Sequence, residues 1–319
     1  MNRPPTSTYS LIRYCNVLLL TVCIITVSFE VAARDPFTER EKDHYVYSAI
    51  RGTISAADTI TFRRKIKSIR WLGGDSSAFQ AMVNGSNQLV LTYRPSKDFI
   101  GISRTKLRVE FRTNDSRTIE LTGLSTRALE GENEAPLATI LQALRYPVNV
   151  GWETLANHCR PELEGEEVRG QLFRKVGKGK VSMIPLARYS PDFKLGFGYY
   201  VATDDSVTKH EAGVLSLAGK HPEHQTLYPA HSINKSFPDP GNKAFGFYAE
   251  SPTHTAFTQD TLNARLFPKY VVHAARVYPL KNSKGVAQPN TFLVCFEEAK
   301  NGDYNDYVFI VTNVEMVMP

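Results

Sequence analysis

Residues 106–112 read Lys-Leu-Arg-Val-Glu-Phe-Arg, and this strict alternation predicts a β-strand with one buried face. The apolar side chains on that face are Leu107, Val109 and Phe111. The same pattern returns at 117–121, after a short polar turn. Strands of this kind recur about every ten residues with turn residues between them, which is typical of an all-β sandwich.

The chain divides into two predicted β-rich modules. Residues 45–150 form the first, which resembles the immunoglobulin-like sandwiches of bacterial surface proteins in strand rhythm only, because it contains no cysteine. Apolar residues at helical spacing predict one short helix near 134–145, which Tyr146-Pro147 ends. Residues 151–180 are charged and glycine-rich and are expected to be a linker. Residues 181–319 form the second module, with long polar loops expected from 203 to 243.

The N-terminus has the pattern of an export signal. Two arginines precede an apolar run at 17–29, and small or short residues follow at 31–33. This run is shorter than the roughly 20 residues that a membrane-spanning helix needs. We therefore expect a signal peptide at 1–33, a flexible lead-in at 34–44 and a mature chain without a membrane span, in a secreted, extracellular or periplasmic location.

Charge and cysteine content narrow the function classes. The 38 lysines and arginines exceed the 32 aspartates and glutamates, so that the formal net charge is +6. A mild positive balance suits acidic surfaces or polysaccharides and, in an exported chain, does not indicate a nucleic-acid partner. Only Cys159 and Cys295 lie beyond the predicted signal peptide, so either one disulfide or two separate thiols are compatible with the sequence.

The strongest candidate for a metal site lies near the C-terminus, between two apolar segments. The turn after Phe296 contains the candidate calcium ligands Glu297, Glu298, Asp303, Asn305 and Asp306. Calcium prefers hard oxygen ligands and would offset the repulsion between these carboxylates. The alternative is an acidic turn that is simply solvated.

Residues 295–309 resemble the C-terminal signature of domain-of-unknown-function family 4114, a β-rich module of secreted bacterial proteins. Residues 245–252 support this resemblance, which covers about 180–319. It implies an extracellular module with calcium at the acidic turn. The sequence departs from the family at 299–302, which replaces a glycine-rich insert, and at Tyr307, where valine is common.

A hydrolase is the main alternative function. Glycoside hydrolysis needs two facing carboxylates, and Glu250 with Glu297 or Glu298 would supply such a pair. The sequence contains no Gly-x-Ser-x-Gly motif, which would indicate serine catalysis.

Two further groups of residues have open interpretations. The basic run at 63–70 either meets an anionic polysaccharide or protects the edge of a sheet. His221, His224 and His231 are either zinc ligands or solvated loop histidines. His273 is predicted on a strand as a hydrogen-bonded core histidine.

The sequence thus predicts a secreted, non-catalytic binding or structural protein of the cell surface or extracellular matrix. Calcium is its expected cofactor, and a polysaccharide or another surface protein is its expected partner.

Overall fold

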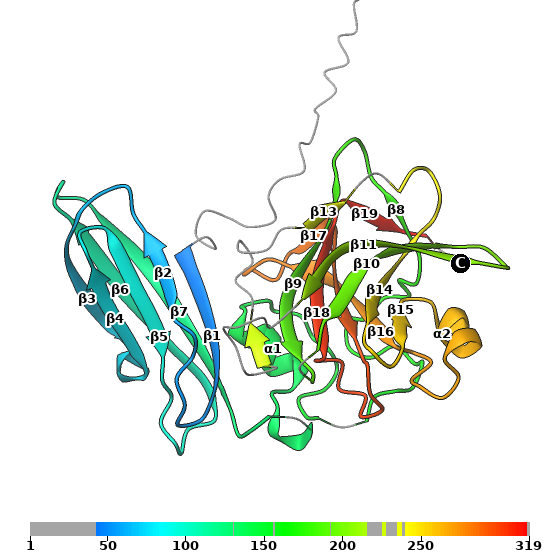
Figure 1. The fold of residues 1–319 in the computed structure, drawn as a ribbon, viewed down its shortest axis with the longest axis horizontal. Coiled ribbons are helices and arrows are strands. Elements are labelled where there is room, and N and C mark those ends of the chain that lie inside the picture. The colour runs from blue at the N-terminus through cyan, green and yellow to red at the C-terminus, as the bar shows by residue number, and fades with distance from the viewer. Residues whose placement is uncertain are drawn as a thin grey trace, which may run out of the picture. The chain divides into compact units, whose positions relative to one another are not determined.

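The computed structural model describes residues 43–317, except 130, 156, 192, 216–224, 228–234 and 238–239. The predicted signal peptide and the histidines at 221, 224 and 231 lie outside the described residues. Strands are the main regular structure of the described part, which has only two short α-helices, so the predicted all-β class is confirmed (Figure 1). None of the described helices has the length and apolarity to cross a membrane.

Two facing sheets form the first module, shown in blue and cyan in Figure 1. One has the order β1-β7-β6-β3 and the other β2-β5-β4. The bounds are β1 His44–Ile50, β2 Asp58–Thr61, β3 Ile66–Gly74, β4 Phe79–Asn84, β5 Gln88–Tyr93, β6 Gly101–Phe111 and β7 Ser116–Thr126. Alternate residues of β6 are buried, among them Leu107 and Val109, and they pack with β5 and β7 in one apolar core. Period-two alternation therefore selects the buried face as the sequence predicts.

The second module also packs sheet against sheet. Its larger sheet has the order β12-β9-β18-β17-β16, with β13 also on β9, and the other has the order β11-β10-β14-β15. The bounds are β8 Phe173–Lys175, β9 Val181–Tyr189, β10 Leu195–Ala202, β11 Val207–Leu215, β12 Gln225–Leu227, β13 Lys235–Phe237, β14 Gly246–Glu250, β15 Thr255–Phe257, β16 Ala275–Lys281, β17 Ala287–Phe296, β18 Tyr307–Thr312 and β19 Val314–Met316. Aromatic side chains from both sheets, including Phe197, Phe247 and Phe309, share one core.

Helix α1 (Leu137–Ala143) lies within the predicted range 134–145. Its buried Leu137, Ile140 and Leu141 belong to a core cluster that also contains side chains of β9, β16, β17 and β18. The same cluster contains Val46 of β1 and Leu124 of β7, so the helix packs in a core that both modules share.

Three local features differ from the sequence predictions. The expected loop region 203–243 contains β11, whose antiparallel pairing with β10 stabilises a mostly exposed strand. Helix α2 (Asp260–Leu266) has few buried residues and gives only a weak periodic signal. His273 is predicted on a strand, but that strand, β16, begins only at Ala275, so His273 lies in the preceding loop.

Candidate functional site

The predicted acidic turn is the loop that joins two central strands of the larger sheet. Strands β17 and β18 pair in antiparallel register, with Phe296 opposite Tyr307, so residues 297–306 form the connection. Gly302 and Tyr304 both have positive φ angles, of 69° and 54°. A β-carbon at Gly302 would lie 2.6 Å from the backbone nitrogen of His158, which shows how closely a distant segment covers the loop.

The carboxylates of this loop are buried. Glu297 is fully buried, Asp303 is 1% exposed and Asp306 is 5% exposed. One oxygen from each lies within 4.8 Å of the others, and we call these three residues the carboxylate cluster. A solvated acidic turn, the alternative from the sequence, does not describe this arrangement.

Backbone N–H groups of the loop hold the carboxylate cluster in place. The Glu297 carboxylate accepts hydrogen bonds from the N–H groups of Ala299 (2.9 Å), Asp303 (2.9 Å) and Tyr304 (3.2 Å). Asp306 Oδ2 accepts the N–H of Glu298 at 2.6 Å. The loop is therefore folded around its own acidic side chains.

Burial makes ionisation of the cluster costly. It raises the pKa of Glu297 to about 7, with a further contribution from the charge of Asp303. It also raises the pKa of Asp303 to about 6 and that of Asp306 well above its usual value. Three such groups either keep protons near neutral pH or share a cation that stabilises all of them as anions.

The structure separates the other two predicted ligands. Asn305 is fully buried beside the cluster: its backbone N–H lies 3.4 Å from Asp303 Oδ1 and its Nδ2 donates to Ala135 O at 3.0 Å. Its Oδ1 is buried without a hydrogen-bond partner among the described residues. Glu298 is half-buried, accepts the Tyr307 hydroxyl and is outside the cluster.

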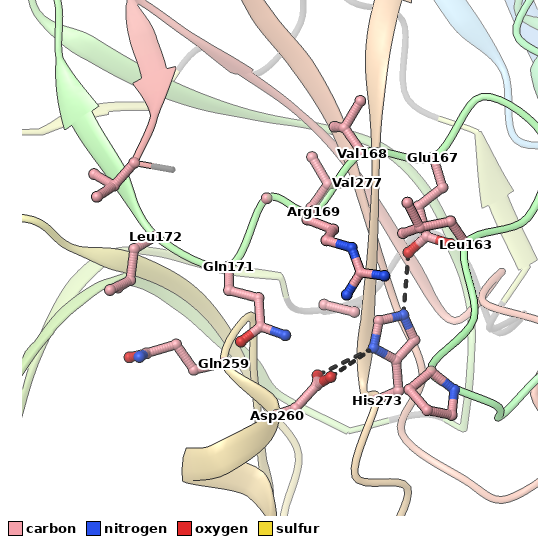
Figure 2. Close-up of a pocket in the computed structure, with 14 residues that line it drawn as sticks. Leu163, Glu167, Val168, Arg169, Gln171, Leu172, Gln259, Asp260, His273 and Val277 are labelled. Atoms are coloured by element: carbon pink, nitrogen blue, oxygen red, sulfur yellow. Dashed lines mark hydrogen bonds and ion pairs between the residues drawn. The ribbon is translucent and has the colours of Figure 1, made fainter. Parts of the chain in front are cut away.

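A cavity of about 380 Å³ opens in the same module and was not predicted from the sequence. Figure 2 shows the His273 ring in its wall, between the carboxylates of Asp260 and Glu167. His273 Nδ1 lies 3.0 Å from Asp260 Oδ2, and Nε2 lies 3.0 Å from Glu167 Oε1. Burial alone would lower the pKa of His273, but these two carboxylates outweigh it and raise the pKa to about 9. Both ring nitrogens of His273 are thus engaged by carboxylates.

Buried Arg276 connects this cavity to the acidic loop. Its guanidinium donates to Glu167 and to the backbone oxygens of His158 (2.5 Å) and Arg160 (2.8 Å). It also lies 4.9 Å from the ring centre of Tyr304, whose hydroxyl donates to His273 O at 2.6 Å. The loop that carries the carboxylate cluster thus supports the wall that carries His273.

The remaining cavity lining combines polar and aliphatic groups. Arg169, Gln171 and Gln259 line it together with Leu172 and Val277 (Figure 2). No aromatic side chain is among the lining residues. The lining comes from segments near 161–172, 259–260 and 273–277, which explains why no local motif could reveal it.

The alternative catalytic pair and the cysteines have defined positions. Glu250 lies at the end of β14, in the other sheet, where its Oε1 is 2.5 Å from Lys209 Nζ. It is not part of the carboxylate cluster with Glu297. Cys159 and Cys295 are both free thiols; Cys295 is buried inside β17, and Cys159 is half-buried against the acidic loop.

Comparison with known proteins gives no family. No family model matches the chain, and no curated protein matches it. Among solved structures, the endo-fucoidan hydrolase MfFcnA4 from glycoside hydrolase family 107 is 11% identical over 26% of this chain and 12% of its own, with a TM-score of 0.22.

Two other solved structures are similarly distant. The secreted serine protease VesC from Vibrio cholerae is 11% identical over 85% of this chain and 49% of its own, with a TM-score of 0.20. The endo-fucoidan hydrolase MfFcnA9 is 11% identical over 66% of this chain and 31% of its own, with a TM-score of 0.24. The matched region thus spans less than half of each of these proteins. TM-scores this low define neither the fold nor the function of this chain.

Proposed function

We propose that this chain is an exported, non-catalytic binding protein of the cell surface or extracellular matrix, whose second module holds a calcium ion at the carboxylate cluster. The observation that carries the proposal is the burial of three carboxylates whose oxygens lie within 4.8 Å of one another. Its partner would be a polysaccharide or another surface protein.

The chemistry of the donors favours calcium over other metals. All candidate ligand atoms are carboxylate or amide oxygens, which hard cations prefer, and the cluster contains no histidine or cysteine of the kind that zinc selects. Asn305 Oδ1 would add a neutral oxygen, and calcium accepts six to eight oxygens in flexible geometry. Backbone hydrogen bonds to Glu297 and Asp306 leave further lone pairs for an ion.

Calcium would act on more than the loop itself. Tyr304 joins the loop to the cavity wall through its hydrogen bond to His273 O, and Arg276 packs on the Tyr304 ring. A loop fixed by an ion would therefore fix the position of His273 and its two carboxylates. The cavity supplies a binding site, and His273 in its wall is held by hydrogen bonds to Asp260 and Glu167.

Isothermal titration of the chelator-treated chain with calcium chloride at pH 7.5 tests this proposal. We expect about one ion per chain, and weaker binding of magnesium, which requires stricter octahedral geometry. Absence of binding up to millimolar calcium would contradict the proposal.

A further inference from the structure

The positive charge of this chain is concentrated in its first module. Residues 43–126 contain 13 lysines and arginines but only 7 aspartates and glutamates. The rest of the chain contains 25 residues of each sign. The whole formal net charge of +6 therefore belongs to these two facing sheets, and the proposed calcium module contributes none of it.

Much of this charge lies on the outer face of one sheet. Along β6, Arg104, Lys106 and Arg108 alternate with the buried Thr105 and Leu107, so the three cations point away from the core. Arg70 of β3 is the direct partner of Arg108, which places it on the same face. We call Arg70, Arg104, Lys106 and Arg108 the basic face.

Two cations of this face oppose each other directly. Arg70 and Arg108 are paired across β3 and β6, and like charges at such positions destabilise a sheet. Neither forms an ion pair within the described part of the chain, and Arg108 Nε is buried without a hydrogen-bond partner there. A bound anion would remove the repulsion and accept these donors.

The acidic side chains of this face do not cancel its charge. Glu120 is held between Lys106 Nζ, at 2.9 Å, and the guanidinium of Arg145. Burial alone would raise the pKa of Glu120, but hydrogen bonds from these two cations hold it at about 2. Glu110 accepts a hydrogen bond from Ser68 Oγ at 2.8 Å. With Arg145, the face carries five cations and two anions.

We propose that the basic face binds a linear polysaccharide that bears sulfate or carboxylate groups. Cations at alternate positions of a strand repeat about every 6.8 Å, which suits a chain of regularly spaced anions. Ser68 and Thr118 lie opposite outward-facing residues of β6, are not buried, and offer hydroxyl groups to sugar hydroxyls. The polysaccharide would be the partner in the proposed binding role, and only its location outside the cell rests on that proposed function. Binding to the basic face requires no calcium.

The geometry favours a polysaccharide over nucleic acid. Ser68 and Arg70 of β3, and the residues from Arg104 to Glu110 that face outward on β6, include no aromatic side chain on which single-stranded bases would stack. A sheet of four strands spaced about 4.8 Å apart is also wider than the major groove of a DNA duplex, which is roughly 12 Å wide.

The test compares binding of dextran sulfate to the full chain and to the variant Arg70→Gln with Arg108→Gln, by biolayer interferometry at several salt concentrations. We expect the variant to lose about tenfold or more in affinity at low salt, and the slope of log affinity against log salt to decrease by roughly two. Arg94→Gln with Lys97→Gln, which removes two exposed charges from a loop outside this sheet, is the matched control and should retain the affinity.

Three further measurements separate binding at the basic face from misfolding, from calcium-dependent binding and from binding to other anions. Arg70→Lys with Arg108→Lys should retain most of the binding and shows that the face still folds. Binding should persist in EDTA, so its loss there would overturn this inference while leaving the calcium proposal standing. Equal losses in the Arg94 and Lys97 variant, or tighter binding to duplex DNA or phosphatidylserine vesicles than to dextran sulfate, would also overturn it.

Discussion

Removing charge from the carboxylate cluster should abolish a calcium-dependent gain in stability. The perturbation is Asp303→Asn with Asp306→Asn, which keeps the shape of both side chains and removes two of the three buried charges. Without these charges, the remaining oxygens cannot offset the cost of dehydrating a divalent ion.

The size of the effect follows from linkage between ion binding and folding. An ion that binds only the folded state at about 100 times its Kd stabilises it by about 2.7 kcal/mol. For a domain of roughly 150–250 residues, each kcal/mol shifts Tm by about 2–4 °C. The unaltered chain should therefore melt roughly 5–10 °C higher in saturating calcium than in EDTA, and the double variant should show almost no difference.

The ion-free state gives a second readout. Because the substitutions remove repulsion among buried carboxylates, the variant in EDTA at pH 8 should melt no lower than the unaltered chain. Asp204→Asn with Asp205→Asn, two exposed aspartates in the turn between β10 and β11, is the matched control and should keep the full calcium shift. Differential scanning calorimetry measures all of these values. An unaltered chain that melts at the same temperature in calcium and EDTA, or a double variant that keeps the shift, would refute the reasoning.

Three other predictions concern the same module. In EDTA, the stability of the chain should fall as pH rises from about 5 to 8. The reason is that the pKa of Glu297 is raised to about 7, so the folded state binds more protons than the unfolded state over that range. A melting temperature that rises with pH would contradict this prediction. His273 has the same sign of pH dependence over a higher range. Its pKa is raised to about 9, so the stability it provides is complete below about 6.5 and is lost as pH rises through 9. The variant His273→Gln should eliminate this loss in the same melting series. Gly302→Ala should destabilise the chain by about 2–4 kcal/mol in denaturant titrations, since it adds a clash at 2.6 Å to a φ of 69°. Gly285→Ala, with a φ of 76° and open space around it, should cost only about 1–2 kcal/mol, and equal losses would show that packing against the loop is unimportant.

The strands of this protein could be predicted from its sequence because their signal is local. Alternation at 106–112 predicts β6, and the apolar segments on either side of the acidic turn predict the β17–β18 hairpin. The first pattern depends on the period of two that an extended chain imposes on its side chains, and the second on short continuous apolar runs that flank a turn. The same reasoning failed for β11, whose exposed residues alternate weakly and whose existence depends on pairing with β10.

The candidate ligands were also local, but their environment was not. Six acidic or amide residues within the ten positions 297–306 indicate a possible cation site from composition alone. Whether they are solvated or buried depends on the segment around His158, which lies about 140 residues earlier and covers Gly302. A sequence pattern shows which side of an element is apolar but not which distant segment covers it.

The cavity around His273 was decided entirely by tertiary structure. Glu167, Asp260 and His273 are separated by 93 and 13 residues and belong to a linker, a helix and a loop. Only the folded chain, in which α2 packs on β15 and the 161–172 segment lies along β16, brings an oxygen of each carboxylate to 3.0 Å from a nitrogen of the same ring. The sequence by itself therefore determined the all-β class and the acidic hairpin, because backbone periodicity and residue content are local properties. The depth of the carboxylates, the charge on His273 and the cavity required the folded chain, because desolvation and ion pairing depend on which distant groups meet.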